Sequence, residues 1–133
     1  MPHFSVEYSD NLDAQVDMGA ICGVLHKAAM QTGLFELGAL RVRAHACKDY
    51  AVADLLDENA FLHLTVSVGS GRDKALLRDA GQAVWAALTA TLEDQFRTPH
   101  FALTMEIREI DPDLSWKKNA IHPRIRAGQE AKQ

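Results

Sequence analysis

The chain opens with the sequence PHFSVEY, residues 2–8, in which apolar and polar side chains alternate. Phe4, Val6 and Tyr8 would share one face of a strand, with Ser5 and Glu7 on the other. The turn-forming residues Ser-Asp-Asn at 9–11 end this strand. A sheet is therefore expected to begin at the N-terminus itself, with one face buried.

The segment after this turn has the spacing of an amphipathic helix. We expect it to begin near residue 13 or at Asp17, a candidate N-cap, and to end at residue 32 before Gly33. A second strand is expected over residues 39–47. Its apolar face would carry Leu40, Val42, Ala44 and Ala46, and its other face Arg41, Arg43, His45 and Cys47.

The same order of elements then repeats after a polar connection over residues 48–59. A third strand is expected over residues 61–68, and a Gly-Ser-Gly turn follows it. A second helix should begin at Arg72 or Asp73 and run to about Phe96, and a fourth strand should span residues 101–110. The sequence predicts an α+β fold in which β-α-β occurs twice, giving a four-stranded sheet with two helices on one face.

Length and composition suit a single domain, since the chain has 133 residues of which 47% are hydrophobic. We assign this domain to residues 1–122 and expect residues 123–133 to form a polar, frayed C-terminal tail. Helices on one face leave the other face of the sheet uncovered. We therefore expect surplus apolar sheet surface and an oligomer, with residues 114–121 as a short strand or hook against a neighbour.

The charge balance restricts the partners that this chain can have. Its net charge of −4 argues against nucleic acid and anionic membrane as partners. No apolar run approaches the roughly 20 residues of a membrane span, and no signal-peptide pattern opens the chain. The two cysteines, Cys22 and Cys47, lack C-x-x-C spacing and are expected to be reduced, as in a cytoplasmic protein.

Pro2 is the first candidate for chemistry. Bacterial processing normally removes a methionine that precedes proline, and this would leave a prolyl secondary amine at the end of a strand. An ordinary α-amino group has a pKa of about 8, and desolvation and nearby cations would lower the pKa of such an amine towards neutrality. The amine could then act as a base. Proline is also a common second residue, so Pro2 alone does not decide the function.

Taken together, these residues resemble the 5-carboxymethyl-2-hydroxymuconate isomerases, a branch of the tautomerase superfamily. The likeness extends from residue 2 to about residue 122. The matching stretches are Pro2-His3-Phe4 with Glu7, Ser9-Asp10-Asn11, Thr32-Gly33-Leu34-Phe35, Arg41-Val42-Arg43-Ala44-His45, Gly69-Ser70-Gly71-Arg72, Ile110-Asp111-Pro112 and Lys117-Lys118-Asn119.

The resemblance implies a homotrimer and a cofactor-free keto-enol tautomerase. Pro2 would be the catalytic base or proton shuttle, and Arg41 and Arg72 would bind and polarise the substrate. The implied substrate is the tricarboxylate 5-carboxymethyl-2-hydroxymuconate, whose dienol becomes the 2-oxo-3-ene isomer in homoprotocatechuate breakdown, downstream of 4-hydroxyphenylacetate. We also assign Arg43 and Trp116 to substrate binding. Trp116 stands where the resemblance implies phenylalanine, which bears on fine substrate selectivity.

Other functions remain open from the sequence. The same amine could serve a related tautomerase, a hydratase or a dehalogenase acting on another 2-hydroxydienoate-like acid. A non-enzymatic trimeric binding protein on this fold is the alternative outside enzymes. His45 and Cys47 share a strand face and could ligate a metal, but no second pair has suitable spacing, so we expect no metal site.

Overall fold

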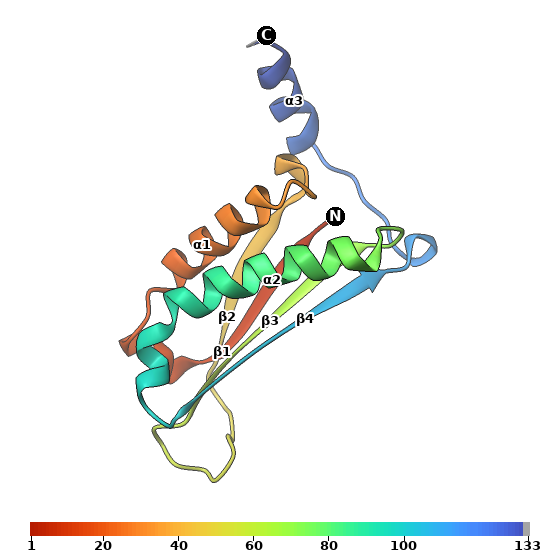
Figure 1. Ribbon diagram of the computed structural model, residues 1–133. Helices are drawn as coiled ribbons and strands as arrows, with labels where there is room; N and C mark the ends of the chain where they lie inside the picture. The colour runs from red at the N-terminus through yellow and green to blue at the C-terminus, as the bar shows by residue number, and fades with distance from the viewer. Residues whose placement is uncertain (132–133) are drawn as a thin grey trace.

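One mixed four-stranded sheet forms the frame of the computed structural model, which describes residues 1–131. The strands are β1 (His3–Ser9), β2 (Arg41–Cys47), β3 (Ala60–Gly69) and β4 (Phe101–Ile110). Their order is β2-β1-β3-β4, with parallel pairs β1–β2 and β3–β4 and an antiparallel pair β1–β3 at the centre. The predicted α+β fold with two β-α-β units is thus confirmed (Figure 1).

Two long helices, α1 (Met18–Gln31) and α2 (Lys74–Thr91), lie across the same face of this sheet (Figure 1). Each helix has an aspartate as its N-cap. The Asp17 carboxylate accepts a hydrogen bond from the Ala20 N–H, and the Asp73 carboxylate accepts one from the Ala75 N–H. The prediction that the second helix reaches Phe96 was too long. The α-helix ends at Thr91, and a short 3-10 turn spans Glu93–Arg97.

The core lies between the sheet and these two helices. The alternation in the opening strand is confirmed, since Phe4, Val6 and Tyr8 are buried against α1 and β3 neighbours. Strand β3 alternates strictly between buried and half-buried residues along its whole length. Burial of apolar area at about 25 cal/mol per Å² is the main force that holds the helices on this face.

The uncovered face of the sheet is polar, so the expectation of surplus apolar sheet surface was wrong. Strand alternation places the buried apolar residues of the sheet beneath the helices and leaves mostly polar residues on the other face, where Phe61 is an exception. On this face His63 contacts the Thr104 hydroxyl at 2.6 Å and the Glu106 carboxylate at 3.1 Å, and Arg108 donates to Glu106 at 2.8 Å.

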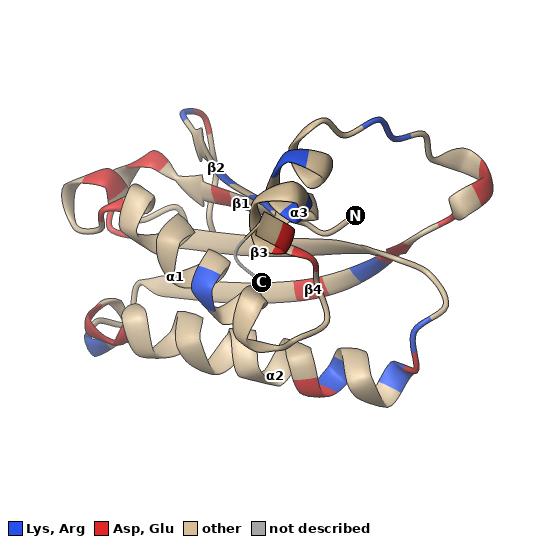
Figure 2. Ribbon diagram, turned by 90° about the horizontal axis from the view of Figure 1, so that it is seen from above, with Lys and Arg blue, Asp and Glu red and all other residues tan. Residues whose placement is uncertain are grey.

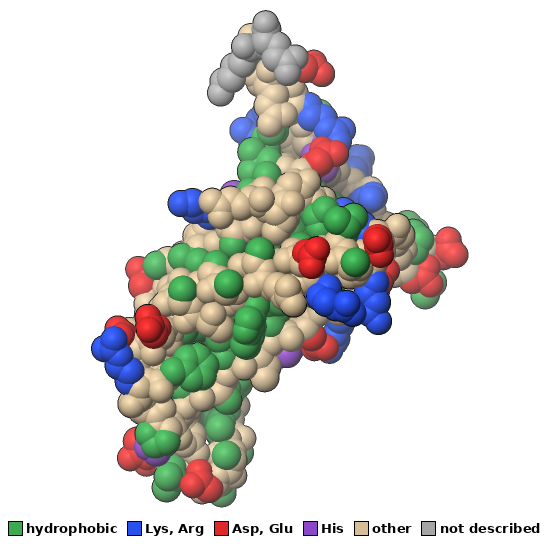
Figure 3. All heavy atoms as spheres, viewed as in Figure 1, with side chains coloured by type: hydrophobic (Ala, Val, Ile, Leu, Met, Phe, Trp, Pro, Cys, Tyr) green, Lys and Arg blue, Asp and Glu red, His purple; other side chains and the backbone are tan. Residues whose placement is uncertain are grey.

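Exposed apolar side chains are found elsewhere. Figure 3 shows hydrophobic side chains at the surface along α2, where Leu76 and Trp85 are exposed. Two more lie just after β4, where Leu114 is 72% and Trp116 is 86% exposed. Other exposed large apolar side chains lie in the β2–β3 loop, such as Leu55 at 69%, and within residues 1–131 none of these exposed side chains belongs to a strand.

The segment after β4 leads to a third helix that the sequence did not predict. A 3-10 turn at Pro112–Leu114 is followed by irregular chain to residue 120, which we call the strap, and then by α3 (Ile121–Ala131). Proline is tolerated in α3 because Pro123 lies in the first turn, where the backbone N–H has no helical partner. The expected polar tail is thus helical to residue 131, and residues 132–133 lie outside the described residues.

Helix α3 packs beside a 3-10 turn at Leu37–Ala39. The side-chain amide of Asn119 donates to the Gly38 carbonyl at 2.9 Å, while its oxygen accepts from the N–H groups of Ile121 and His122. Asn119 therefore both caps α3 and attaches it to the domain. Figure 2 shows the strap arching beside the N-terminus before it enters α3.

Within residues 1–131, no helix combines the length and the apolar character that a bilayer crossing requires.

Replacing Gly38 by alanine should detach α3 while leaving the core folded. A Cβ atom at this position would lie 2.6 Å from Nδ1 and 3.0 Å from Cα of His122, so the helix must move. Because α3 buries no residue, the thermal midpoint should change little. Hydrogen exchange should show faster exchange at residues 121–131 in G38A. G128A, where the added methyl group meets nothing within 4 Å, is the control. Unchanged protection in G38A would contradict the packing described.

Candidate active site

A cavity of about 410 Å³ opens at the N-terminus, where the start of β1, the loop after α1, the turn before α2 and the strap meet. We call it the N-terminal cavity. Its lining residues are Met1, Pro2, Leu34, Phe35, Glu36, Ala39, Arg72, Lys117, Asn119, His122 and Arg126.

A smaller cavity of about 200 Å³ lies against the same terminus, and we call it the side cavity. It is lined by Met1, Gly69, Ser70, Ile110, Pro112, Ser115 and Lys117. Met1 and Lys117 line both cavities, so the first residue of the chain stands between them.

The sheet fixes the position of Pro2. The Arg41 backbone N–H donates to the Pro2 carbonyl at 3.2 Å, which extends the β1–β2 ladder to the second residue. The residue that follows, His3, pairs with Arg41 on one side and Ser67 on the other. Pro2 is buried, so its nitrogen is held at the end of a central strand.

Arg72 reaches the N-terminal cavity from the turn before α2. Gly71 takes a left-handed φ of +103°, which favours glycine and lets the turn close just before the Asp73 cap. The Arg72 guanidinium donates to the carbonyls of Gly69 at 3.1 Å and Leu34 at 3.3 Å, and its centre lies 5.5 Å from the Phe35 ring centroid. Two backbone carbonyls and an aromatic face thus orient this cation.

Arg41 adjoins the terminus from β2. Its guanidinium donates to the Ala39 carbonyl at 2.8 Å and lies 2.9 Å from the Met1 sulfur. Arg41 does not line the N-terminal cavity itself. It lies against Met1, the residue whose removal would expose the nitrogen of Pro2.

The electrostatic setting weakens the basicity of the terminal amine. In this chain the amine belongs to Met1, one residue ahead of Pro2. Burial lowers the pKa of the Met1 amine below its usual value, and the charges of Lys117, Arg72 and Arg41 lower it further. An amine in these surroundings is unprotonated over a wider pH range than a free one.

The structure brings together three of the predicted site residues, Pro2, Arg41 and Arg72. It does not bring Arg43 or Trp116 to either cavity of the single chain. Arg43 lies on the uncovered sheet face, with its guanidinium 3.1 Å from Nδ1 of His3. Trp116 is exposed on the strap. Their roles in substrate binding stay predictions.

Four residues of the C-terminal segment line this cavity and were not predicted as site residues from the sequence: Lys117, Asn119, His122 and Arg126. Arg126 donates to the Glu36 carboxylate through both Nε and Nη2, and Nδ1 of His122 lies 3.4 Å from the same carboxylate. The Arg126 hydrogen bond lowers the pKa of Glu36. The one acidic residue lining this cavity is therefore already paired with cations. The sequence signal that could have indicated these residues is the group of basic side chains near the C-terminus of a chain that is acidic as a whole.

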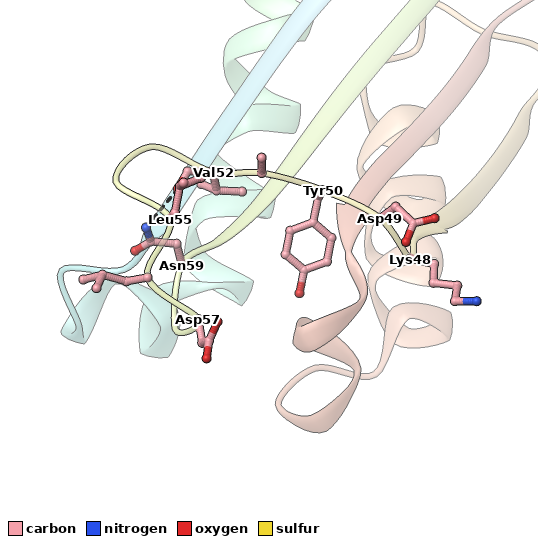
Figure 4. A pocket seen from close by; sticks show the side chains of 9 residues that line it. Lys48, Asp49, Tyr50, Val52, Leu55, Asp57 and Asn59 are labelled. Atoms are coloured by element: carbon pink, nitrogen blue, oxygen red, sulfur yellow. Dashed lines mark hydrogen bonds between the residues drawn. The ribbon is translucent and has the colours of Figure 1, made fainter.

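A third hollow, of about 430 Å³, lies in the β2–β3 loop at the end of the sheet away from the N-terminus (Figures 1 and 4). Figure 4 shows Lys48, Tyr50 and Asp57 pointing in different directions. The Asn59 amide donates to the Val52 carbonyl at 3.1 Å and to Asp54 at 2.7 Å, which shapes the loop. The charged side chains drawn there do not converge on a ligand.

Potential metal ligands are also dispersed. Among residues 1–131, no three His, Cys, Asp or Glu side chains are grouped to hold a metal ion. His45 and Cys47, considered above as ligands, lie on strand β2 opposite Glu7 and Ser9.

Comparison with known proteins identifies the family. The sequence profile of 5-carboxymethyl-2-hydroxymuconate isomerase matches residues 2–125. The 5-carboxymethyl-2-hydroxymuconate Delta-isomerase of Escherichia coli is 30% identical over 122 residues, covering 92% of this chain and 97% of that protein.

Solved structures agree with this result. A 5-carboxymethyl-2-hydroxymuconate isomerase from Deinococcus radiodurans R1 is 32% identical, with a TM-score of 0.87 and 93% of each chain covered. A fused 4-OT, described as a symmetric trimer, is 15% identical with a TM-score of 0.64 over 87% of this chain and 93% of that one, and shares the fold alone.

The profile match spans nearly the whole chain, and the Escherichia coli relative matches over almost its full length. The chain therefore belongs to the 5-carboxymethyl-2-hydroxymuconate isomerase family.

Proposed function

We propose that this protein isomerises 5-carboxymethyl-2-hydroxymuconate without a cofactor and uses the amine of Pro2 as its proton shuttle. The observation that carries the proposal is the setting of the terminal amine. In the chain that still carries Met1, this amine is that of Met1, which is half-buried beside the start of β1; burial, and then the charges of Lys117, Arg72 and Arg41, lower its pKa. The Pro2 amine of the processed protein would lie among the same charges. A base with a pKa near neutrality is what removal of a hydroxyl proton requires.

The proton transfer needs only this amine and the arginines. With Met1 removed, the Pro2 nitrogen takes the proton from the dienol hydroxyl, and the oxygen–hydrogen electron pair becomes the carbonyl bond. The conjugated electrons shift along the chain, and the far carbon takes the proton back from the prolinium. No atom is gained or lost. Arg41 or Arg72 stabilises the dienolate oxygen while it carries negative charge.

The carboxylates of the substrate would bind to the cationic side chains around the site. A guanidinium binds a carboxylate through two parallel hydrogen bonds, and Arg72 is already oriented by the Gly69 and Leu34 carbonyls. A tricarboxylate enters a site whose one lining carboxylate, Glu36, is paired with Arg126. We place the reaction in homoprotocatechuate and 4-hydroxyphenylacetate degradation in the cytoplasm.

We further propose a homotrimer, in which the strap lies against a neighbour's sheet edge. Within residues 1–131, strands β2 and β4 each have a free edge, and Leu114, at the end of the 3-10 turn, and Trp116, on the strap, are exposed. Contact with a neighbouring subunit would also give Trp116 and Arg43 access to a site that they do not reach in one chain.

Removal of either arginine should slow the reaction without unfolding the protein. Loss of one charge-assisted hydrogen bond costs about 1.5–3 kcal/mol, so R72A and R41A should each lose roughly tenfold to a hundredfold in kcat/KM. R97A is the control, since Arg97 is exposed and its one ion pair within residues 1–131 is with Asp94, three residues before it. Steady-state kinetics and circular dichroism are the measurements. Wild-type kinetics in both R72A and R41A would show that the site is assigned wrongly.

Retention of Met1 should abolish most of the activity. The Pro2 nitrogen is then an amide without basicity, while the fold and the assembly are unchanged. Kinetics should be measured on a preparation whose mass proves that Met1 is attached, beside the processed form from the same expression. Full activity of the Met1-bearing form would rule out proline catalysis.

The assembly is tested by sedimentation equilibrium. We expect three times the chain mass of 14.7 kDa at micromolar concentration. Replacing Trp116 by aspartate should shift the protein towards smaller species, because it would place a charge in an apolar contact. A stable wild-type monomer would contradict the proposed trimer.

A further inference from the structure

The side cavity has no role in the mechanism above, yet it shares Met1 and Lys117 with the N-terminal cavity. A ligand lying across the first residue would therefore have one end in each cavity. Arg72 lines only the N-terminal cavity, whereas Lys117 borders both. Lys117 is therefore placed to contact either end of such a ligand, and Arg72 the end in the N-terminal cavity.

The strap holds Lys117 between two anchored points. Before it, the Asp111 carboxylate accepts the Asp113 N–H at 2.9 Å and closes the turn after β4. After it, Asn119 is hydrogen-bonded to the Gly38 carbonyl. Lys117 is two residues before Asn119. Its backbone is therefore held close to the domain, although its side chain is exposed.

Lys117 also differs from the other tail cation that lines the N-terminal cavity. Arg126 is paired with Glu36, whereas no ion pair formed among residues 1–131 includes Lys117. The Lys117 charge lies close enough to the N-terminus to lower the pKa of the Met1 amine more than any other charge does. Its ammonium group is therefore near the terminal amine, and within residues 1–131 it forms no ion pair with a carboxylate.

The lining of the side cavity favours a carboxylate on a short carbon chain. Among the residues that the structure describes, no acidic one lines it. Two serines, Ser70 and Ser115, bring hydroxyl groups, and Ile110 and Pro112 bring apolar surface. Hydroxyls and an ammonium can donate to carboxylate oxygens, while the apolar pair can contact methylene groups.

We propose that Lys117 is a specificity-determining residue, which binds a second carboxylate of the substrate at the side cavity while Arg72 holds the first. The proposal rests on the proposed function and deepens it by naming the substrate class. The site selects acids with carboxylates at both ends and discriminates against monocarboxylates. Binding alone is assigned to Lys117, and the proton transfer stays with the amine.

Calorimetric titration with two simple acids tests this proposal on the processed, Met1-free protein. Tricarballylate, a propane tricarboxylate, can span both cavities, and butyrate can fill only one. In K117A the dissociation constant for tricarballylate should rise about tenfold, the loss of one charge-assisted contact. The constant for butyrate should stay within twofold. K117R keeps the charge and should recover most of the tricarballylate affinity.

K118A is the matched control, because Lys118 is the next residue of the strap and lines neither cavity. It should bind tricarballylate as the wild type does. Equal affinities in K117A and K118A would overturn the proposal, as would a wild type that binds tricarballylate no more tightly than butyrate. The titration requires no turnover. If the protein is inactive but binds the two acids as expected, the proposed isomerase function is refuted and the role of Lys117 is kept. If the protein is an active isomerase but K117A and K118A bind tricarballylate equally, the role of Lys117 is refuted and the isomerase function is kept.

Discussion

The position of the terminal amine at the end of β1 is the constraint on which the rest of the site depends. β1 is a central strand, paired with β2 on one side and β3 on the other, and its ladder continues to the Pro2 carbonyl. Pro2 is therefore held close to Arg41, which comes from β2, and to the cavity that Arg72 lines from the turn after β3. Arg41 and Arg72 come from different parts of the chain, and the pairing of β1 with β2 and β3 brings both of them close to the N-terminus.

Electrostatics then determine what this amine can do. Burial and the charges of Lys117, Arg72 and Arg41 disfavour the ammonium form at this terminus, and they lower the pKa of the Met1 amine. The chain as a whole is acidic, with a net charge of −4. Attraction of an anionic substrate must come from this local cluster, which operates over about one Debye length, near 8 Å at physiological salt.

Much of the fold followed from the sequence because local signals agreed with one another. Alternation in residues 2–8 predicted a strand, which was found. For each long helix the sequence left two possible starts, residue 13 or Asp17 and Arg72 or Asp73, and the structure places the N-caps at Asp17 and Asp73. Helix α3 was not predicted, since it has no buried face and owes its position to Asn119 and Glu36. The polar open face was also missed, because strand register was unknown until β1 and β3 were paired. Arg72 was found through family resemblance, whereas Lys117 was recognised only when the strap was seen beside the N-terminus.

The pKa of the Pro2 amine in the processed, ligand-free protein is the most direct test of this account. It can be read by titrating the nitrogen-15 NMR signal of the N-terminal proline, which is distinct from the three prolines within the chain because it alone is an amine. We expect a pKa clearly below the value of about 8 for an ordinary α-amino group, and a higher value in R72A, where a cation that disfavours the ammonium form is gone. A pKa at or above the ordinary value in the wild type would contradict the account.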